Sequence, residues 1–346
     1  MLPATYVGGP RYMHGKGQDG LTYVKYYGRS DLFITFTCNP NWPEIKSCFS
    51  TEPLLESNKQ IAEHRYDIVA RVFKLKLKKM LDLINQGQIF GPAKCYLYTI
   101  EWQKRGLPHA HCLIWLENKI RPTDIDSIIS AELPDPQEDP ELYEIIKNNM
   151  IHGPCGNINP RSPCMEEGKC TNKYPRRLVA ETRSDVDGYP LYRRRSSEDG
   201  GHTAHVWKNR QQIEIDNSWV VPHNRLLCKI FNAHINVEYC NSVKAIQYVT
   251  KYCTKGPDRA IYEIVPIRNA PDPRDEISCY EMARYISTNE ACWRIFGFDI
   301  HEHYPPVEQL PIHLENGNRV YFNQENILQV AAEPRKTKLT AFMDLC

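Results

Sequence analysis

The chain has 346 residues, of which 41% are hydrophobic, enough for one large or two ordinary domains. Its net charge of +1 gives no bulk attraction to nucleic acid, and no run of 18 apolar residues predicts a membrane span. The start, MLPATYVGGPRYM, lacks the basic and apolar segments of a signal peptide. Thirteen scattered cysteines, an odd number, favour free thiols or metal ligands over a disulfide framework.

The first third of the chain contains clear periodic patterns. Residues 31–42, DLFITFTCNPNW, predict a strand that ends in an Asn-Pro turn. Residues 60–85 repeat apolar side chains at helical spacing and predict a helix. Residues 93–103 and 109–117 predict two strands, and the turn at 104–108 joins them as a hairpin.

The pattern weakens and then resumes. Residues 121–218 are rich in Pro, Gly, Cys and charge, and predict an insertion into the core domain. Residues 219–240 predict strands, whereas 242–255 and 275–288 predict helices, and the Asn-Gly-Asn at 316–318 predicts a hairpin turn. The expected parts are a core domain over 1–120 and 219–265, an insertion over 121–218, and a C-terminal helix and hairpin extension over 266–346.

Two histidines begin the second strand of the hairpin. His109 and His111 project from one face, because strand residues two apart share a face. A five-residue turn would place Gln103 opposite His109 and Glu101 opposite His111, whereas an even-length turn would separate the acid from the histidines. Two imidazoles with a carboxylate or an amide suit Mn²⁺ or Mg²⁺ with open positions for a phosphate. The alternative is a pair of histidines with a structural role.

A second His-x-His pair shows how readily this pattern arises. With 12 histidines, about 0.4 such pairs are expected by chance. His301 and His303 lie in a polar stretch before Tyr-Pro-Pro, and we expect them at the surface.

The helix predicted over 242–255 carries two tyrosines on one face. Tyr248 and Tyr252 are four residues apart, and Lys244, Lys251 and Lys255 share their sector, opposite the apolar stripe. A tyrosine is a weak nucleophile because its pKa is near 10, but a metal and lysines favour the phenolate. The motifs together predict a metal-assisted transesterase that acts on DNA. The alternative is an exposed basic helix.

These motifs resemble those of the HUH endonucleases, the replication initiators and relaxases that nick single-stranded DNA. FITFTCNPNW, EWQKRGLPHAHCLIW and YVTKYCTK stand in the family's order. LPATYVGGPRYM, DLFITFTCNPNWPEI and RGLPHAH look most like the Rep nuclease region of Helitron rolling-circle transposases. The resemblance covers residues 1–300 and implies an α+β fold with a central, mainly antiparallel sheet, flanking helices and a Cys/Pro-rich insertion.

The resemblance also implies site residues. His109 and His111 would bind a divalent metal, Mg²⁺ or Mn²⁺, with Glu101 or Gln103 as third ligand. Tyr248 and Tyr252 would be the nucleophiles, leaving a 5′-phosphotyrosine and a 3′-OH, and Lys251 would assist.

The resemblance further implies partners and a place of action. Single-stranded DNA at transposon ends and targets would be the substrate, no membrane would be involved, and the protein would be nuclear. The chain has no G-x-x-x-x-G-K-[ST] motif, so we expect the helicase elsewhere in the full-length protein. The alternatives are a viral or plasmid replication initiator or relaxase with the same chemistry, and a non-catalytic zinc-containing DNA-binding module.

A cysteine cluster lies inside the predicted insertion. HGPCGNINPRSPCMEEGKC contains His152, Cys155, Cys164 and Cys170, and a Cys₃His set separated by Gly and Pro fits a structural zinc site. Free cysteines in a loop are the alternative. Residues 173–195 contain seven basic and three acidic residues. We expect DNA-backbone contacts from Arg176, Arg177, Arg193, Arg194 and Arg195, together with Lys244 and Lys255, with a solvated basic surface as the alternative.

Overall fold

The computed structural model describes residues 9–48, 65–103, 106–184, 189–208, 211–240, 286–308, 310–314 and 336–346, together with residues 5, 7, 317, 325, 327 and 328. The chain forms two compact units, Met1–Tyr304 and Pro305–Cys346. The predicted helices at 242–255 and 275–288 lie outside the described residues, apart from the last three positions of the second.

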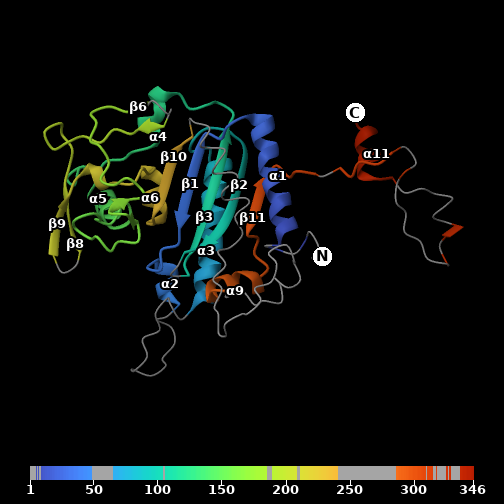
Figure 1. Ribbon diagram of the computed structural model, residues 1–346, viewed down its shortest axis with the longest axis horizontal. Coiled ribbons are helices and arrows are strands. Elements are labelled where there is room, and N and C mark those ends of the chain that lie inside the picture. Colours follow the sequence, from blue (N-terminus) through green and yellow to red (C-terminus); the bar gives the residue numbers. More distant parts are fainter. Residues whose placement is uncertain are drawn as a thin grey trace, which may run out of the picture. The chain divides into compact units, whose positions relative to one another are not determined.

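The first unit is built on a five-stranded antiparallel sheet (Figure 1), so the predicted α+β class is confirmed. The strand order is β10-β1-β3-β2-β11. In that order the strands are Ile235–Tyr239, Leu32–Thr37, Pro108–Leu116, Ala93–Trp102 and His301–Tyr304.

Helices cover both faces of the sheet. On one face, Phe73 of α3 (Tyr66–Asn85) lies against Phe36 of β1 with ring centroids 5.3 Å apart, and against Trp293 of α9 (Thr288–Ile295). This is the main apolar core. On the other face, Tyr23 of α1 (Pro10–Tyr27) packs on Trp115 of β3. His109 and His111 share this second face with Trp115, because all three alternate along one strand.

The hairpin of β2 and β3 keeps the predicted face but changes the predicted register. Glu101 lies opposite His109, and Thr99 lies opposite His111. The Gln103 N–H donates to Leu107 O at 3.1 Å, so the turn holds three residues instead of the expected five. Its last residue, Gly106, has φ 77°, which suits a short hairpin loop. The predicted turn and the observed turn both have an odd number of residues, and for this reason Glu101 and the two histidines remain on one face of the hairpin.

Two other expectations are wrong. Residues 225–231 form a helix, α6 (Arg225–Phe231), inside the region predicted as strands. The Asn224 side chain accepts from the Leu227 N–H and caps its start, while Asn232 takes the left-handed conformation at its end. The histidines of the second His-x-His pair belong to β11, where His301 lies opposite Thr99, and both are partly buried instead of exposed at the surface.

Residues of the predicted insertion have a smaller apolar core of their own. Its largest helix is α5 (Pro140–Asn149), capped by the Asp139 side chain, and it packs against α6. Leu142, Ile146 and Trp219 belong to this second core. The other elements are short: η2 (Pro122–Asp124), α4 (Ile125–Ile128), β4 (Met165–Glu166), β5 (Lys169–Cys170), β6 (Arg183–Ser184), β7 (Pro190–Leu191), β8 (Ala204–Lys208), β9 (Gln211–Ile215) and η3 (Asn217–Trp219).

The remaining described elements are α2 (Pro43–Ser47), which follows β1, and α11 (Lys338–Met343) in the second unit. Thr337 begins α11 with a reciprocal capping box to Thr340. The unit that contains the sheet runs through Tyr304 and so includes α9 and β11. Among the described residues, no helix is both long and apolar enough to span a membrane.

Candidate functional site

The structure brings the two histidines of β3 and two polar side chains of β2 together on one face of the sheet. The rings of His109 and His111 have centroids 4.6 Å apart. Glu101 Oε2 lies 3.0 Å from His111 Nε2, and Gln103 Nε2 lies 3.3 Å from His109 Nδ1. The acid therefore reaches diagonally across the hairpin to the histidine next to its own cross-strand partner.

Two threonines of β1, absent from the sequence prediction, complete the surroundings of the histidines. Thr37 lies opposite His109, with its hydroxyl 2.7 Å from His109 Nδ1. Thr35 lies opposite His111, with its hydroxyl 3.4 Å from His111 Nδ1. The signal was present in FITFT, because Thr35 and Thr37 are two apart on one strand. What the sequence lacked was the pairing of β1 with β3.

Burial keeps the first histidine uncharged. Burial and the neighbouring His111 both hold the pKa of His109 well below its usual range. His111 is itself buried and its ring stacks on Phe33, with centroids 5.6 Å apart and planes 6° apart. A neutral imidazole is the form that binds a metal ion, and a hydrogen bond at one ring nitrogen orients the other. The donor set and its surroundings thus fit a divalent metal.

The residues expected to carry out nucleophilic attack belong to a different part of the chain. Tyr248, Tyr252 and Lys251 lie outside the described residues, as do Lys244 and Lys255. Their predicted roles stay predictions.

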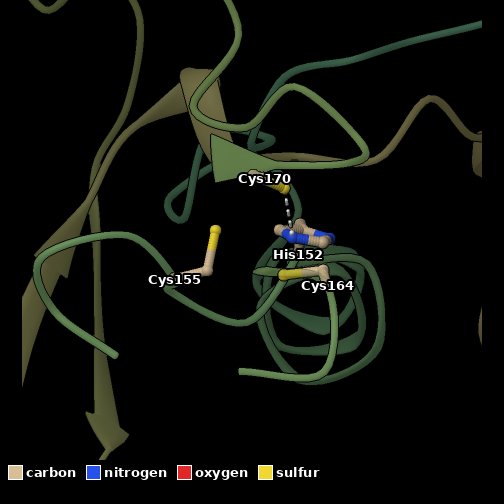
Figure 2. A group of neighbouring side chains, drawn as sticks. All are labelled: His152, Cys155, Cys164 and Cys170. Carbon is tan, nitrogen blue, oxygen red and sulfur yellow. Dashed lines mark hydrogen bonds between the residues drawn. The ribbon is translucent and has the colours of Figure 1, made fainter. Parts of the chain in front are cut away.

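The predicted zinc ligands come together in the insertion. Figure 2 shows His152, Cys155, Cys164 and Cys170 gathered around one space from separate stretches of chain. Their ligand atoms all lie within 4.8 Å of one another, and this cluster could hold a metal such as zinc. We call it the Cys₃His cluster.

Local structure positions three of the four ligands of the Cys₃His cluster. Cys164 and Cys170 flank the tight hairpin of β4 and β5, where Thr171 N–H donates to Cys164 O at 2.8 Å. The two turn residues, Glu167 and Gly168, both have positive φ, as the favoured two-residue hairpin turn requires. His152 follows α5, and its ring stacks on Tyr174 with centroids 4.2 Å apart.

The surroundings of the Cys₃His cluster shift the pKa values of its ligands in different directions. Burial and the nearby Arg176 lower the pKa of His152 to about 4, so the imidazole is neutral. Burial raises the pKa of Cys170, but backbone N–H groups of Tyr174 and Asn172 outweigh it and leave that pKa lowered. Burial raises the pKa of Cys155 to about 12. Without a cation, the cluster therefore contains one thiol that ionises more readily than another.

The predicted DNA-binding arginines differ in their contacts. Arg194 is buried and donates to the carbonyl oxygens of Ala131, Asn217 and Val220, which favours a structural role. Arg193 and Arg195 both donate to the Glu132 carboxylate. Arg176 lies over the Tyr174 ring at 5.1 Å, and Arg177 is exposed.

A family model matches the first third of the chain. Residues 1–114 match the model of a family described as the Helitron helicase-like domain at the N-terminus. The match includes β1, β2 and nearly all of β3, and so the strands that carry Thr35, Glu101 and His111. No curated protein matches the sequence. The family match supports a Helitron-related protein.

Proposed function

We propose that this protein is a metal-dependent endonuclease and strand transferase for single-stranded DNA, acting in rolling-circle transposition. The observation that carries the proposal is the polar face of the hairpin. His109, His111 and Glu101 converge there beside the threonines of β1. The family match supports the same assignment at the coarser level of a Helitron-related protein.

His109, His111 and Glu101 would hold Mg²⁺ or Mn²⁺, with Gln103 as a neighbour. Glu101 is the better third ligand because its carboxylate lies against His111 Nε2, whereas the Gln103 amide lies against His109 Nδ1. When bound, the ion supplies Lewis-acid polarisation of a DNA phosphate. The threonine hydroxyls at both Nδ1 atoms would fix the ring orientations, as partners of metal-binding histidines do.

In the proposed reaction, a tyrosine oxygen forms the new bond to phosphorus while the bond from phosphorus to the 3′ oxygen breaks. The phenol gives up its proton and the departing 3′ oxygen takes one up, which leaves a 3′-OH and a 5′-phosphotyrosine. Tyr248 and Tyr252 would make two such links in succession, and Lys251 would stabilise charge on the phosphate oxygens. A free 3′-OH can then reverse the step on another strand.

The described residues leave enough chain for these tyrosines to reach the histidines. Cys240 follows β10 at the far end of the sheet, where its N–H donates to Asp31 O. Asn236 of β10 and His111 of β3 both lie opposite Thr35 of β1. Asn236 is four strand residues, or about 13 Å, from Cys240. Tyr248 follows Cys240 by eight positions, and eight positions of extended chain can reach about 26 Å.

Single-stranded DNA would contact side chains that the fold leaves accessible. Arg177 is exposed in the basic stretch, and Trp207 of β8 is 74% exposed. A cation near the phosphates and an exposed aromatic ring for base stacking are the two elements that single-strand binding uses. Arg194 is not part of this proposal, since its guanidinium is bound to backbone carbonyls.

The test is cleavage of end-labelled single-stranded oligonucleotides in Mn²⁺ or Mg²⁺, followed by denaturing gels for a covalent protein–DNA adduct. Wild type should release a product with a 3′-OH and retain the other part of the strand. The double variant Tyr248→Phe/Tyr252→Phe should form no adduct, whereas the matched control Tyr26→Phe, at a position 82% exposed on α1, should behave as wild type. An adduct in the double variant, or no cleavage by wild type, would contradict the proposal.

A further inference from the structure

The Cys₃His cluster has the dimensions of an occupied metal site. A tetrahedral zinc ion with bonds of about 2.3 Å to sulfur and about 2.1 Å to nitrogen sets its ligand atoms about 3.5 to 3.8 Å apart. Cys170 Sγ already lies 3.5 Å from His152 Nε2 (Figure 2), and no pair of ligand atoms in the cluster exceeds 4.8 Å. Small side-chain movements therefore suffice to bind the ion.

The identity of the ligands selects the metal and its role. Three thiolates and one imidazole favour zinc over Mg²⁺ or Mn²⁺, which prefer oxygen ligands. Four protein ligands fill a tetrahedral coordination sphere and leave no position for water or substrate, so the site is structural. None of the three cysteines forms a disulfide. A disulfide between any two of them would leave the third unpaired.

Among the described residues, the chain around the Cys₃His cluster has little apolar packing. Near the Cys₃His cluster, β4 and β5 contain two residues each, and only Met165 and the cysteines link this hairpin to the second apolar core. Short loops without a core of their own commonly take their folding energy from a structural metal.

Backbone contacts connect the Cys₃His cluster to the central sheet. The His152 N–H donates to Trp219 O at 2.9 Å, and the Val221 N–H donates to Met150 O at 2.7 Å. The Met150 sulfur in turn accepts from the N–H of Ile235, the first residue of β10. Met150, two positions before the ligand His152, therefore contacts the strand that leads into the tyrosine segment.

We propose that the Cys₃His cluster is a structural zinc site that fixes the insertion against β10. This site is separate from the proposed catalytic metal and does not depend on the nuclease assignment. Zinc holds the β4–β5 hairpin to the end of α5, and α5 is held to the sheet through Met150. Loss of zinc should loosen the insertion first, and the central sheet should keep its fold.

The first test measures zinc in the full chain, purified without chelator, by elemental analysis and native mass spectrometry. We expect about one zinc ion per chain, and replacement by Co²⁺ should give the thiolate-to-cobalt and tetrahedral absorption bands. Cys164→Ser and Cys170→Ser should each lose the ion. Cys48→Ser, at an exposed cysteine outside the cluster, should keep it.

The second test needs no variant and so does not depend on whether the serine variants fold. Wild type treated with a zinc chelator should be cut by a protease within residues 121–218 well before the sheet is cut, and added zinc should restore protection. Absence of zinc from the wild type, full zinc in both serine variants, or unchanged proteolysis after zinc removal would each overturn the proposal.

Discussion

The histidine face of the sheet and the Cys₃His cluster each bring metal-ligand side chains together, but different structural features hold those side chains in place. At the histidine face, three paired strands fix the side chains, and Thr35 and Thr37 orient the rings whether or not an ion is bound. In the Cys₃His cluster, the ligands come from separate loops and a hairpin of two-residue strands. At the histidine face the fold positions the metal ligands, whereas at the Cys₃His cluster the metal would hold the surrounding chain in its fold.

The largest effect should follow removal of a ligand at the histidine face. His109→Ala should lower the cleavage rate by about a thousandfold, because metal polarisation of the phosphate is worth several kcal/mol. The melting temperature should stay near that of wild type, since the sheet does not depend on the ion. His205→Ala, at an exposed histidine on β8, is the control for both cleavage rate and melting. A variant that simply unfolds would assign His109 a structural role.

The second prediction separates structural from DNA-binding arginines. Arg194→Met should lower the free energy of unfolding by about 3 kcal/mol, because three buried carbonyl oxygens lose their donor. Arg177→Met should leave stability unchanged and weaken single-stranded DNA binding instead. Chemical denaturation and titration of DNA at two salt concentrations measure the two effects. Equal loss of stability in both variants would contradict this division.

The third prediction concerns the loss of stability at low pH that the buried His223 should cause. Burial lowers the pKa of His223 to about 4, whereas the unfolded chain has an ordinary value near 6.5. As the pH falls through this window, His223 binds a proton in the unfolded state but stays neutral in the folded state. The free energy of unfolding therefore decreases from its value at pH 7. Unfolding should require about 2 kcal/mol less at pH 5 than at pH 7 from this group alone.

The control for this pH effect is His223→Leu, measured by denaturant titration across the same range. It should show a shallower pH dependence than wild type, because the buried group that resists protonation is gone. Identical slopes in the two proteins would show that His223 does not titrate as inferred.

The smallest predicted effect tests the threonines. Thr37→Val should weaken Mn²⁺ binding and cleavage about tenfold, with Thr37→Ser close to wild type because the hydroxyl is kept. Thr35→Val should have less effect, since its hydroxyl lies 3.4 Å from the histidine nitrogen instead of 2.7 Å. Calorimetric titration with Mn²⁺ gives the order of affinities. A larger effect at Thr35 than at Thr37 would reverse the expected ranking.

Sequence reasoning succeeded where the controlling contacts are local. Alternation along 109–117 placed both histidines on one face, and a turn of odd length kept Glu101 with them even though the register was wrong by two residues. The Cys₃His cluster was found from ligand types and intervening Gly and Pro, because loops let ligands converge without a strict period.

The errors arose where distant segments decide the structure. β11 became a strand by pairing with β2 from more than two hundred residues away, which no local pattern around His301 revealed. Thr35 and Thr37 became partners of the histidines only through the pairing of β1 with β3. The basic run around Arg194 predicted an exposed cation, but its guanidinium donates to the backbone carbonyl oxygens of Asn217 and Val220.

The most direct test of the proposed chemistry is to map the covalent adduct. Wild-type protein would be incubated with single-stranded DNA and Mn²⁺, digested with protease and nuclease, and the modified peptide sequenced by mass spectrometry. The account predicts a nucleotide on Tyr248 or Tyr252, formed with Mn²⁺ and absent when the metal is chelated or His109 is replaced. A nucleotide on any other residue, or an adduct that forms equally without a divalent metal, would contradict it.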